Sequence, residues 1–417
     1  MIRALTLAGL LLAVACHAAP APADPLAALA TPVRIAATAD DDFADLAPFG
    51  AAVGPARIVA LDEQTHGGHE EFVLKTRLLR YLHERLGFDV LVLESGLFDV
   101  GQLELARQSG ARVDDLGPGN IFFMYSKSAE GRALLQYLDA TRNTPHPITL
   151  AGMDSQHTGA LSQAQLMPRL LSFLGAHVPA SGAPPHPDWR EEDWSGFAAT
   201  TAALLALHPT PPSPEARAGF DRVSAALLRR FATIADPVPA SGTSTWWARV
   251  IVDLQAQAQQ LWTAPRGNAR DQAMGDNVAW IADRLLPGQR LVVWGHAIHL
   301  VHDAPNPDAP PLAGTVMRRH FGAGYHVAHL TGLEGRYLDY TTLRPHDIPA
   351  AAPGSLEARL ATRPGDALYL APPPGPVADA PAARYIDYLP FGPLPGRGLH
   401  WESTFFIRRI TPVTMVR

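Results

Sequence analysis

The sequence has few of the residues that crosslink or metallate small exported domains. Its 417 residues contain a single cysteine, Cys16, so no internal disulfide and no paired-cysteine zinc site can form. Lysine and arginine together (34) are slightly fewer than aspartate and glutamate (40), which gives a net charge of −6. Because nucleic-acid-binding domains carry a basic face, this balance argues against nucleic acid as a partner.

The N-terminus also lacks an apolar run long enough to span a bilayer. Arg3 is followed by the short apolar stretch Ala4–Val14 and then by small residues before Cys16, so residues 1–19 are predicted to be a signal peptide. The pattern resembles a bacterial lipoprotein signal, in which the cysteine is lipidated; cleavage nearby without lipidation is the alternative. Both predict an exported protein, either periplasmic or attached to a membrane through Cys16, and a cysteine-poor body suits an oxidising compartment.

The rest of the chain is long enough to bury a large core. Residues 20–35, rich in alanine and proline, are predicted to be a tether, and residues 36–417 to form one folded domain.

Short apolar strands alternate with helices in the first part of this domain. Apolar residues at helical spacing predict a helix over 69–86, ended by Gly87, and a second helix follows over 97–108. Strand–helix–strand alternation indicates βαβ units, so we predict an α/β fold with a mostly parallel central sheet flanked by helices. The four main strands are expected at 57–61, 89–93, 148–152 and 290–294.

Between about 161 and 286 the pattern changes to helices separated by proline breaks, which predicts a large helical lobe. Its helices are expected at 161–177, 190–208, 214–235, 244–262 and 269–286. The sheet then resumes, with a helix over 312–321 and a strand over 325–331. Three later runs are expected to be strands at the edge of the sheet: 336–342, 367–370 and 404–410.

Polar side chains follow each of the four main strands. In an open parallel sheet, ligands bind beyond the carboxyl ends of the strands, so these side chains should converge on one pocket. The residues expected to line that pocket are Glu63, His66, Glu94, Asp154, His296 and His299.

Each of these residues also has a purely structural interpretation. Thr65 is a candidate N-cap for the helix that follows it. Glu94 could be a buried acid satisfied by backbone amides, and His296 and His299 could be ordinary polar residues at the end of a strand. The combination of Glu63 with His66 is harder to explain by helix capping.

Several familiar catalytic motifs are absent from the sequence. It has no G-x-S-x-G elbow, no H-E-x-x-H zinc motif, no Walker loop and no convincing dinucleotide fingerprint. Cys16 cannot be a catalytic nucleophile because it lies in the signal region. A histidine–glutamate site without a protein nucleophile can activate water, either by general base catalysis or through a metal.

Six segments in collinear order resemble the erythromycin esterase family of hydrolases. The first, "DEQTHGGHEEF", is similar to the family pattern G-E-x-T-H-G-x-x-E-F. The others are "LESG", "GMDSQ", "ARDQAMGDNVAWI", "VVWGHAIHL" and "GTVMRRHFGAGYHV". Members of this family open the macrolide lactone ring by adding water, without a covalent nucleophile.

This resemblance implies roles for particular residues. His66 would be the general base that takes a proton from water, with Glu63 and Glu94 raising its basicity or positioning the water. An adjacent carboxylate should raise the pKa of such a histidine toward working pH. His296 would assist at the carbonyl group or the leaving alcohol. The residues expected to contact the substrate are His299, Lys75, Asp154 and Arg270.

At three positions the chain departs from the family pattern. The family usually has Gly at the position of Asp62, Asn at that of Ala297 and often Arg at that of Lys75. Lysine offers a point charge in place of a planar fork. The first two departures, together with export, bear on whether macrolides are the substrate.

The leading hypothesis is a hydrolase of a small-molecule ester or lactone that uses no metal and no cofactor. One alternative is a metal-dependent hydrolase or peptidase with His66, His296, His299 and a carboxylate as ligands, a set that suits zinc or manganese. The other is a non-catalytic envelope protein that binds a ligand.

Overall fold

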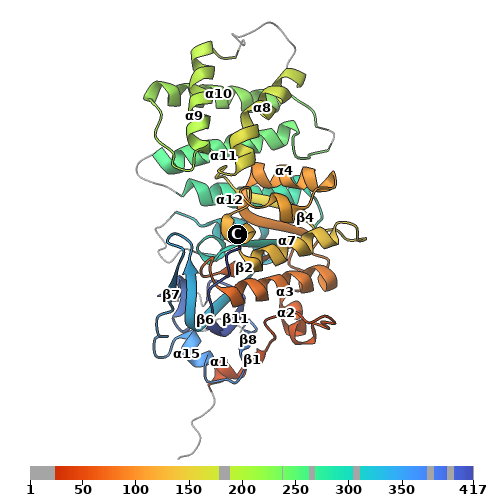
Figure 1. Ribbon diagram of the computed structural model, residues 1–417, viewed down its shortest axis with the longest axis vertical. Helices are drawn as coiled ribbons and strands as arrows, with labels where there is room; N and C mark the ends of the chain where they lie inside the picture. The colour runs from red at the N-terminus through yellow and green to blue at the C-terminus, as the bar shows by residue number, and fades with distance from the viewer. Residues whose placement is uncertain are drawn as a thin grey trace, which may run out of the picture.

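A sheet-bearing body and a helical lobe make up the protein, of which we have a computed structural model (Figure 1). None of the described helices is long and apolar enough to cross a membrane. Cys16 and the predicted signal peptide lie outside the described residues. Those residues are 24–177, 188–236, 238–262, 268–303, 310–372, 380–391 and 399–416.

The main sheet is nine-stranded within the described residues, and most of its pairings are parallel. The strand order is β1-β8-β11-β6-β2-β5-β3-β4, with β7 paired to β6. This arrangement confirms the predicted α/β fold with a mostly parallel sheet. The bounds are β1 Ala30–Pro32, β2 Ile58–Glu63, β3 Val90–Gly96, β4 Thr149–Asp154, β5 Leu291–His296, β6 Tyr325–Asp339, β7 Arg344–Asp347, β8 Ala367–Leu370 and β11 Ser403–Ile410.

Alternating apolar side chains on each strand build a separate core on each face of the sheet. In β2, Val59 and Leu61 pack with α3 (His69–Leu86) and α7 (Ala129–Thr141). Ile58 and Ala60 join the core on the other face, with α12 (Ala269–Trp280) and α14 (Ala313–Phe321). Because both faces are covered, the central strands read as continuous apolar runs in the sequence.

The sheet differs from the prediction at its edge. The runs 367–370 and 404–410 are interior strands, and the run expected at 336–342 begins inside β6, which continues unbroken from Tyr325 to Asp339. The strand at this end of the sheet is β1, which pairs with β8, and β4 lies at the opposite end. β1 lies in the segment expected to be a tether, so the part of that segment from Asp24 onward was assigned wrongly. Alanine and proline content hid the fact that Leu26, Ala27 and Ala30 are buried.

The helical lobe has its own apolar core and lies at the upper end of Figure 1. Its helices are α8 Ala160–His177, α9 Glu191–Leu205, α10 Pro214–Phe231 and α11 Ser244–Trp262. Two glycines allow α9 and α10 to approach closely: a Cβ at Gly196 would lie 2.8 Å from the Ala216 carbonyl oxygen. Leu97 and Phe98 of α4 (Leu97–Gln108) also enter this core and so join the lobe to the body.

The remaining elements are short. The predicted helix at 269–286 is α12 followed by a π-helical turn. The other described elements are α1 Pro25–Ala28, η1 Ala44–Leu46, α2 Ala47–Val53, α5 Val113–Leu116, α6 Phe123–Lys127, η2 Ile281–Leu285, α13 Ala297–Leu300, η3 Gly322–Gly324, α15 Leu356–Leu360, β9 Ala383–Ile386 and β10 Leu389–Phe391.

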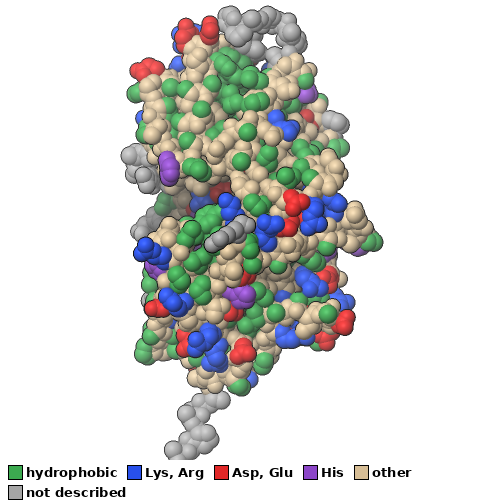
Figure 2. Space-filling view, in the orientation of Figure 1, with side chains coloured by type: hydrophobic (Ala, Val, Ile, Leu, Met, Phe, Trp, Pro, Cys, Tyr) green, Lys and Arg blue, Asp and Glu red, His purple; other side chains and the backbone are tan. Residues whose placement is uncertain are grey.

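The surface carries charges of both signs. On the face drawn in Figure 2, these side chains are interspersed over the sheet-bearing body, in accord with the small net charge.

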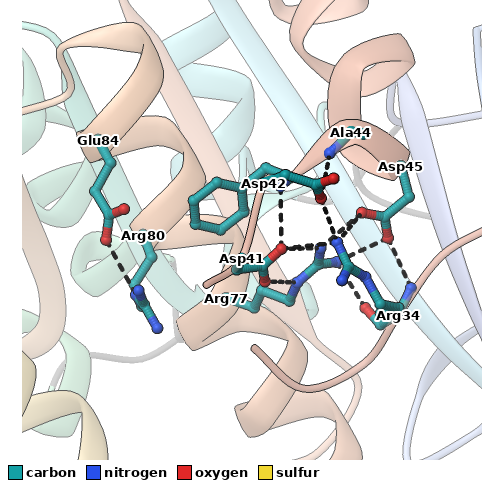
Figure 3. Close-up of polar contacts among 9 residues, drawn as sticks. Arg34, Asp41, Asp42, Ala44, Asp45, Arg77, Arg80 and Glu84 are labelled. Carbon is teal, nitrogen blue, oxygen red and sulfur yellow. Dashed lines mark hydrogen bonds and ion pairs between the residues drawn. The ribbon is translucent and has the colours of Figure 1, made fainter. Parts of the chain in front are cut away.

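A buried ion-pair cluster fastens the N-terminal segment to α3 (Figure 3). Arg77 donates from Nε to Asp41 Oδ2 at 2.6 Å and from one guanidinium nitrogen to Asp45 Oδ1 at 2.6 Å. The side chains of Arg77 and Asp41 are fully buried. Arg34 also donates to Asp41, at 2.8 Å. Removing a partner from a buried ion pair costs far more than removing one from an exposed pair.

We therefore expect Arg77→Met to destabilise the fold by about 3 kcal/mol, at the low end of the cost of breaking a buried pair because Arg34 still reaches Asp41. The matched control is Arg80→Met. It removes the partly exposed Arg80–Glu84 pair on the same helix and should cost at most about 1 kcal/mol. Urea unfolding of both variants measures the difference, and equal losses would contradict the prediction.

The same cluster predicts a pH dependence. The bond from Arg77 holds the pKa of Asp41 below its usual value. A lowered carboxyl pKa contributes stability above the pKa of the unfolded state, and this contribution is lost as pH falls through the folded pKa. The wild type should therefore lose more stability than Arg77→Met as the pH falls below about 4.

Candidate active site

The carboxyl ends of β2, β5, β3 and β4 meet at one cavity of about 730 Å³. Six of the eight predicted site residues line it: His66, Glu94, Asp154, Arg270, His296 and His299. The strand register explains part of this convergence, because Glu63 of β2 is paired with His296 of β5.

Glu63 contacts the His66 ring and orients it. His66 Nδ1 lies 3.0 Å from Glu63 Oε1, and the Tyr125 hydroxyl donates to the same oxygen at 2.7 Å. Because a carboxylate only accepts hydrogen bonds, the network assigns the proton of a neutral His66 to Nδ1. The lone pair of the ring is then on Nε2. Tyr125 lies on α6, in a stretch where the sequence offered no signal for a site residue.

Lys75 contacts the other oxygen of Glu63, Oε2. Its ammonium group lies 4.1 Å from the centre of the Trp294 ring, and its side chain is fully buried. Burial lowers the pKa of Lys75 well below its usual value, and the negative charges of Asp62 and Glu94 oppose that shift. The structure thus places Lys75 against Glu63 and not among the cavity-lining residues.

Aromatic rings surround His66 on the cavity side. Its ring centre lies 4.7 Å from that of Phe122, 4.9 Å from His296 and 5.2 Å from Tyr340. Burial lowers the pKa of His66 to about 4, because the opposing attraction of Glu94 is the smaller effect. The expected rise in the pKa of His66 was therefore wrong, and the ring is neutral at pH 7.

Glu94 is bonded to groups other than His66, one of them a backbone amide. Its Oε2 accepts from the backbone N–H of His296 at 2.8 Å, and its Oε1 lies 3.2 Å from Arg270 and 3.3 Å from His299. Burial alone would raise the pKa of Glu94, but His299 and Arg270 lower it well below its usual value. Glu94 is therefore charged, and it holds these groups in place; it makes no hydrogen bond to His66.

Arg270 and Asp154 form a bidentate ion pair in the wall of the cavity. Arg270 donates from Nε to Asp154 Oδ1 at 3.0 Å and from a terminal nitrogen to Oδ2 at 2.7 Å. This joins α12 to the end of β4, two elements far apart in the chain. The planar guanidinium suits such paired contacts better than an ammonium would.

His299 is the charged histidine of the site. Its Nδ1 lies 2.6 Å from Asp271 Oδ1, and its Nε2 faces Glu94. Burial opposes charging, but the carboxylates of Glu94 and Asp271 raise the pKa of His299 to about 9. Asp271 was not predicted as a site residue, although it directly follows Arg270 in a segment that resembles the family.

His296 is neutral at pH 7. Burial and the nearby His66 lower the pKa of His296 well below its usual value. Its Nδ1 accepts from the backbone N–H of Ile298 at 3.1 Å, so the remaining proton is on Nε2.

Two further expectations concern helix capping and metal binding. The capping prediction was wrong: Thr65 does not cap α3, whose N-cap residue is Gly68. Among the described residues, no three His, Cys, Asp or Glu side chains are grouped so as to hold a metal ion.

These features define the class of the protein: an α/β protein whose cavity at the strand ends is lined by histidines and carboxylates. The sequence model described as "Erythromycin esterase" matches residues 83–388, and the chain belongs to the erythromycin esterase family. The matched range begins after β2 and so does not include Glu63 and His66.

Two curated relatives fit this membership. YbfO of Bacillus subtilis, which carries a provisional hydrolase name, is 25% identical over 345 residues, covering 73% of this chain and 71% of that protein. Erythromycin esterase type II of Escherichia coli is 31% identical over 121 residues, covering 29% of this chain and 28% of that protein. These names support hydrolase activity.

Three solved structures share the fold. A Bacillus cereus protein aligns with a TM-score of 0.74 at 20% identity, over 94% of this chain and 98% of that one. A protein described as a succinoglycan biosynthesis protein gives 0.72 at 18%, over 93% and 96%. A mutant of erythromycin esterase EreC in its open conformation gives 0.70 at 14%, over 92% and 98%.

The geometry predicts different titrations for two histidines of the site. NMR of the protein with ¹⁵N-labelled histidine should show His299 titrating near pH 9 and His66 near pH 4. A raised histidine pKa contributes stability that is complete below the unfolded pKa of about 6.5 and is lost as pH rises through the folded value. Asp271→Asn should lower the pKa of His299. A neutral His299 at pH 7 in the wild type would contradict this assignment.

Proposed function

We propose that the protein hydrolyses a carboxylic ester or lactone, with His66 as the general base that activates water. The observation that carries the proposal is the His66–Glu63 contact of 3.0 Å at the cavity, which leaves the Nε2 lone pair of a neutral ring available. Family membership and the names of the relatives support the same chemistry.

In the proposed reaction, His66 Nε2 takes a proton from water while the water oxygen attacks the carbonyl carbon. The bond from that carbon to the alcohol oxygen then breaks, and the alcohol oxygen takes up a proton as the acid product forms. We propose that His296 donates its Nε2 proton to the developing oxyanion or the leaving oxygen. General base catalysis contributes about 10²–10⁴-fold and one oxyanion donor about 10²–10³-fold, so both are needed.

The proposed substrate is a small molecule. The cavity of about 730 Å³ is of the size that binds small ligands. A macrolide is one candidate, while Asp62 and Ala297 depart from the pattern of the macrolide-cleaving family. We also propose export, with lipidation of Cys16 or cleavage nearby, on the strength of the signal-like residues 1–19.

His66→Ala should lower kcat/KM for the best ester or lactone found by at least about 10²-fold, because the base is removed. The matched control is His69→Ala. That side chain bonds to Glu130 at 2.6 Å and does not line the cavity, so activity should be retained. The assay covers aryl esters, simple lactones and macrolides.

Three results would contradict the proposal. Turnover retained in a folded His66→Ala protein would exclude its role as the base. Activity lost on chelation and restored by zinc or manganese would favour the metal-dependent alternative. The absence of turnover on every ester and lactone would favour a ligand-binding protein.

The pH dependence of kcat/KM follows from the two histidines. Activity requires neutral His66, so it should fall as the pH drops through about 4. It should also fall as the pH rises through about 9, where His299 loses the charge that holds Glu94. Rates measured from pH 3.5 to 10, with circular dichroism at each pH to check folding, test this. An acidic limb near 6.5 would mean that His66 titrates as a free histidine does.

A further inference from the structure

The β9–β10 hairpin forms part of the cavity wall and has a strained turn. Asp387 and Tyr388 connect the two strands with φ of 47° and 58°. Two-residue turns with both central residues at positive φ strongly favour asparagine or glycine, and other side chains adopt that geometry only when their surroundings impose it. Ile386 and Asp387 line the cavity, so the position of this turn shapes the substrate site.

Contacts with the end of β2 hold the hairpin in place. The backbone N–H of Asp387 donates to the Gln64 carbonyl oxygen at 2.9 Å. A second contact holds β9 of the same hairpin, because His329 Nε2 lies 3.1 Å from the Arg384 carbonyl oxygen. His329 lies on β6 of the main sheet and is thus positioned to donate to β9 of the hairpin.

Asp62 in turn holds His329. His329 Nδ1 lies 2.8 Å from Asp62 Oδ2, and Asp62 Oδ1 accepts from the backbone N–H of Leu330 at 2.9 Å. Both side chains are fully buried. The imidazole ring stacks on Trp401, with ring centres 3.9 Å apart. Asp62 directly precedes Glu63, so one strand end carries both this pair and the proposed catalytic pair, on opposite faces of the sheet.

We propose that Asp62 and His329 are positioning residues for the substrate. They fix the β9–β10 hairpin to the end of β2 and thereby set the Ile386–Asp387 wall of the cavity. Asp62 stands where the family pattern usually has glycine, which has no side chain to form this pair. The part of the proposal that concerns KM rests on the proposed ester or lactone hydrolysis; the part that concerns the hairpin does not.

Two substitutions of His329 separate its two contacts. The amide of His329→Asn lies near the place of Nδ1, so it can still donate to Asp62 but not to Arg384. The longer His329→Gln reaches the place of Nε2 and the Arg384 carbonyl. His329→Asn should raise KM by about 3–10-fold, the worth of one hydrogen bond, with kcat unchanged. His329→Gln should restore KM toward the wild-type value.

The matched control is His326→Asn, on the same strand. His326 is also buried, but its Nε2 lies 2.8 Å from Ser403 Oγ and it points to the other face of the sheet. This variant should lose stability as His329→Asn does and keep the wild-type KM. A purely structural role for His329 would give the two variants the same kinetics.

Hydrogen–deuterium exchange on the full chain tests the hairpin without any assay of activity. His329→Asn and Asp62→Gly should both speed exchange of the peptide 383–391, and His326→Asn should not. Unchanged exchange at 383–391 overturns the proposal, as does a KM effect equal to that of the control. Faster exchange in a protein without esterase activity would refute the proposed function and leave the hairpin assignment standing.

Discussion

The parallel pairing of β2 between β5 and β6 is the constraint on which two polar clusters depend, the one around Glu63 and the one around Asp62. Side chains alternate along a strand, so Asp62 and Glu63 must face opposite sides of the sheet. Pairing with β5 brings His296 beside Glu63, and the proximity of β6 brings His329 to Asp62. A shift of the register by one residue would exchange the two carboxylates and break both clusters at once.

The three histidines of the cavity differ in charge because their partners differ. His66 and His296 are buried without a carboxylate strong enough to offset the loss of hydration, so both are neutral at pH 7. His299 lies between Glu94 and Asp271, and it is charged. One residue type therefore supplies both neutral rings and a fixed cation to the same cavity.

α12 connects the helical lobe to this chemistry. It presents Arg270 to the cavity and Asp271 to His299. Asn277, two turns on, donates to the Met153 carbonyl oxygen of β4 at 2.9 Å and to Asp253 of α11 at 2.9 Å. The lobe thus has its own core and is also hydrogen-bonded to the sheet-bearing body through α12. The helix that bears Arg270 is bonded to both the lobe and the sheet.

The sequence by itself determined the longer helices at 69–86, at 97–108 and in the lobe, because their apolar spacing fits a helical period. It determined the four main strands because each is a short continuous apolar run. It also determined that polar residues at four strand ends would meet: of the six residues expected from that pattern, all but Glu63 line one cavity. Composition misled only where burial depends on a distant partner, as in β1, which needs β8 to complete it. Tertiary structure alone decided the charge of each histidine, the place of Lys75 against Glu63, and the recruitment of Tyr125, Asp271 and His329. The physical reason is that these outcomes depend on loss of water and on contacts between residues far apart in the chain, and no local pattern encodes either.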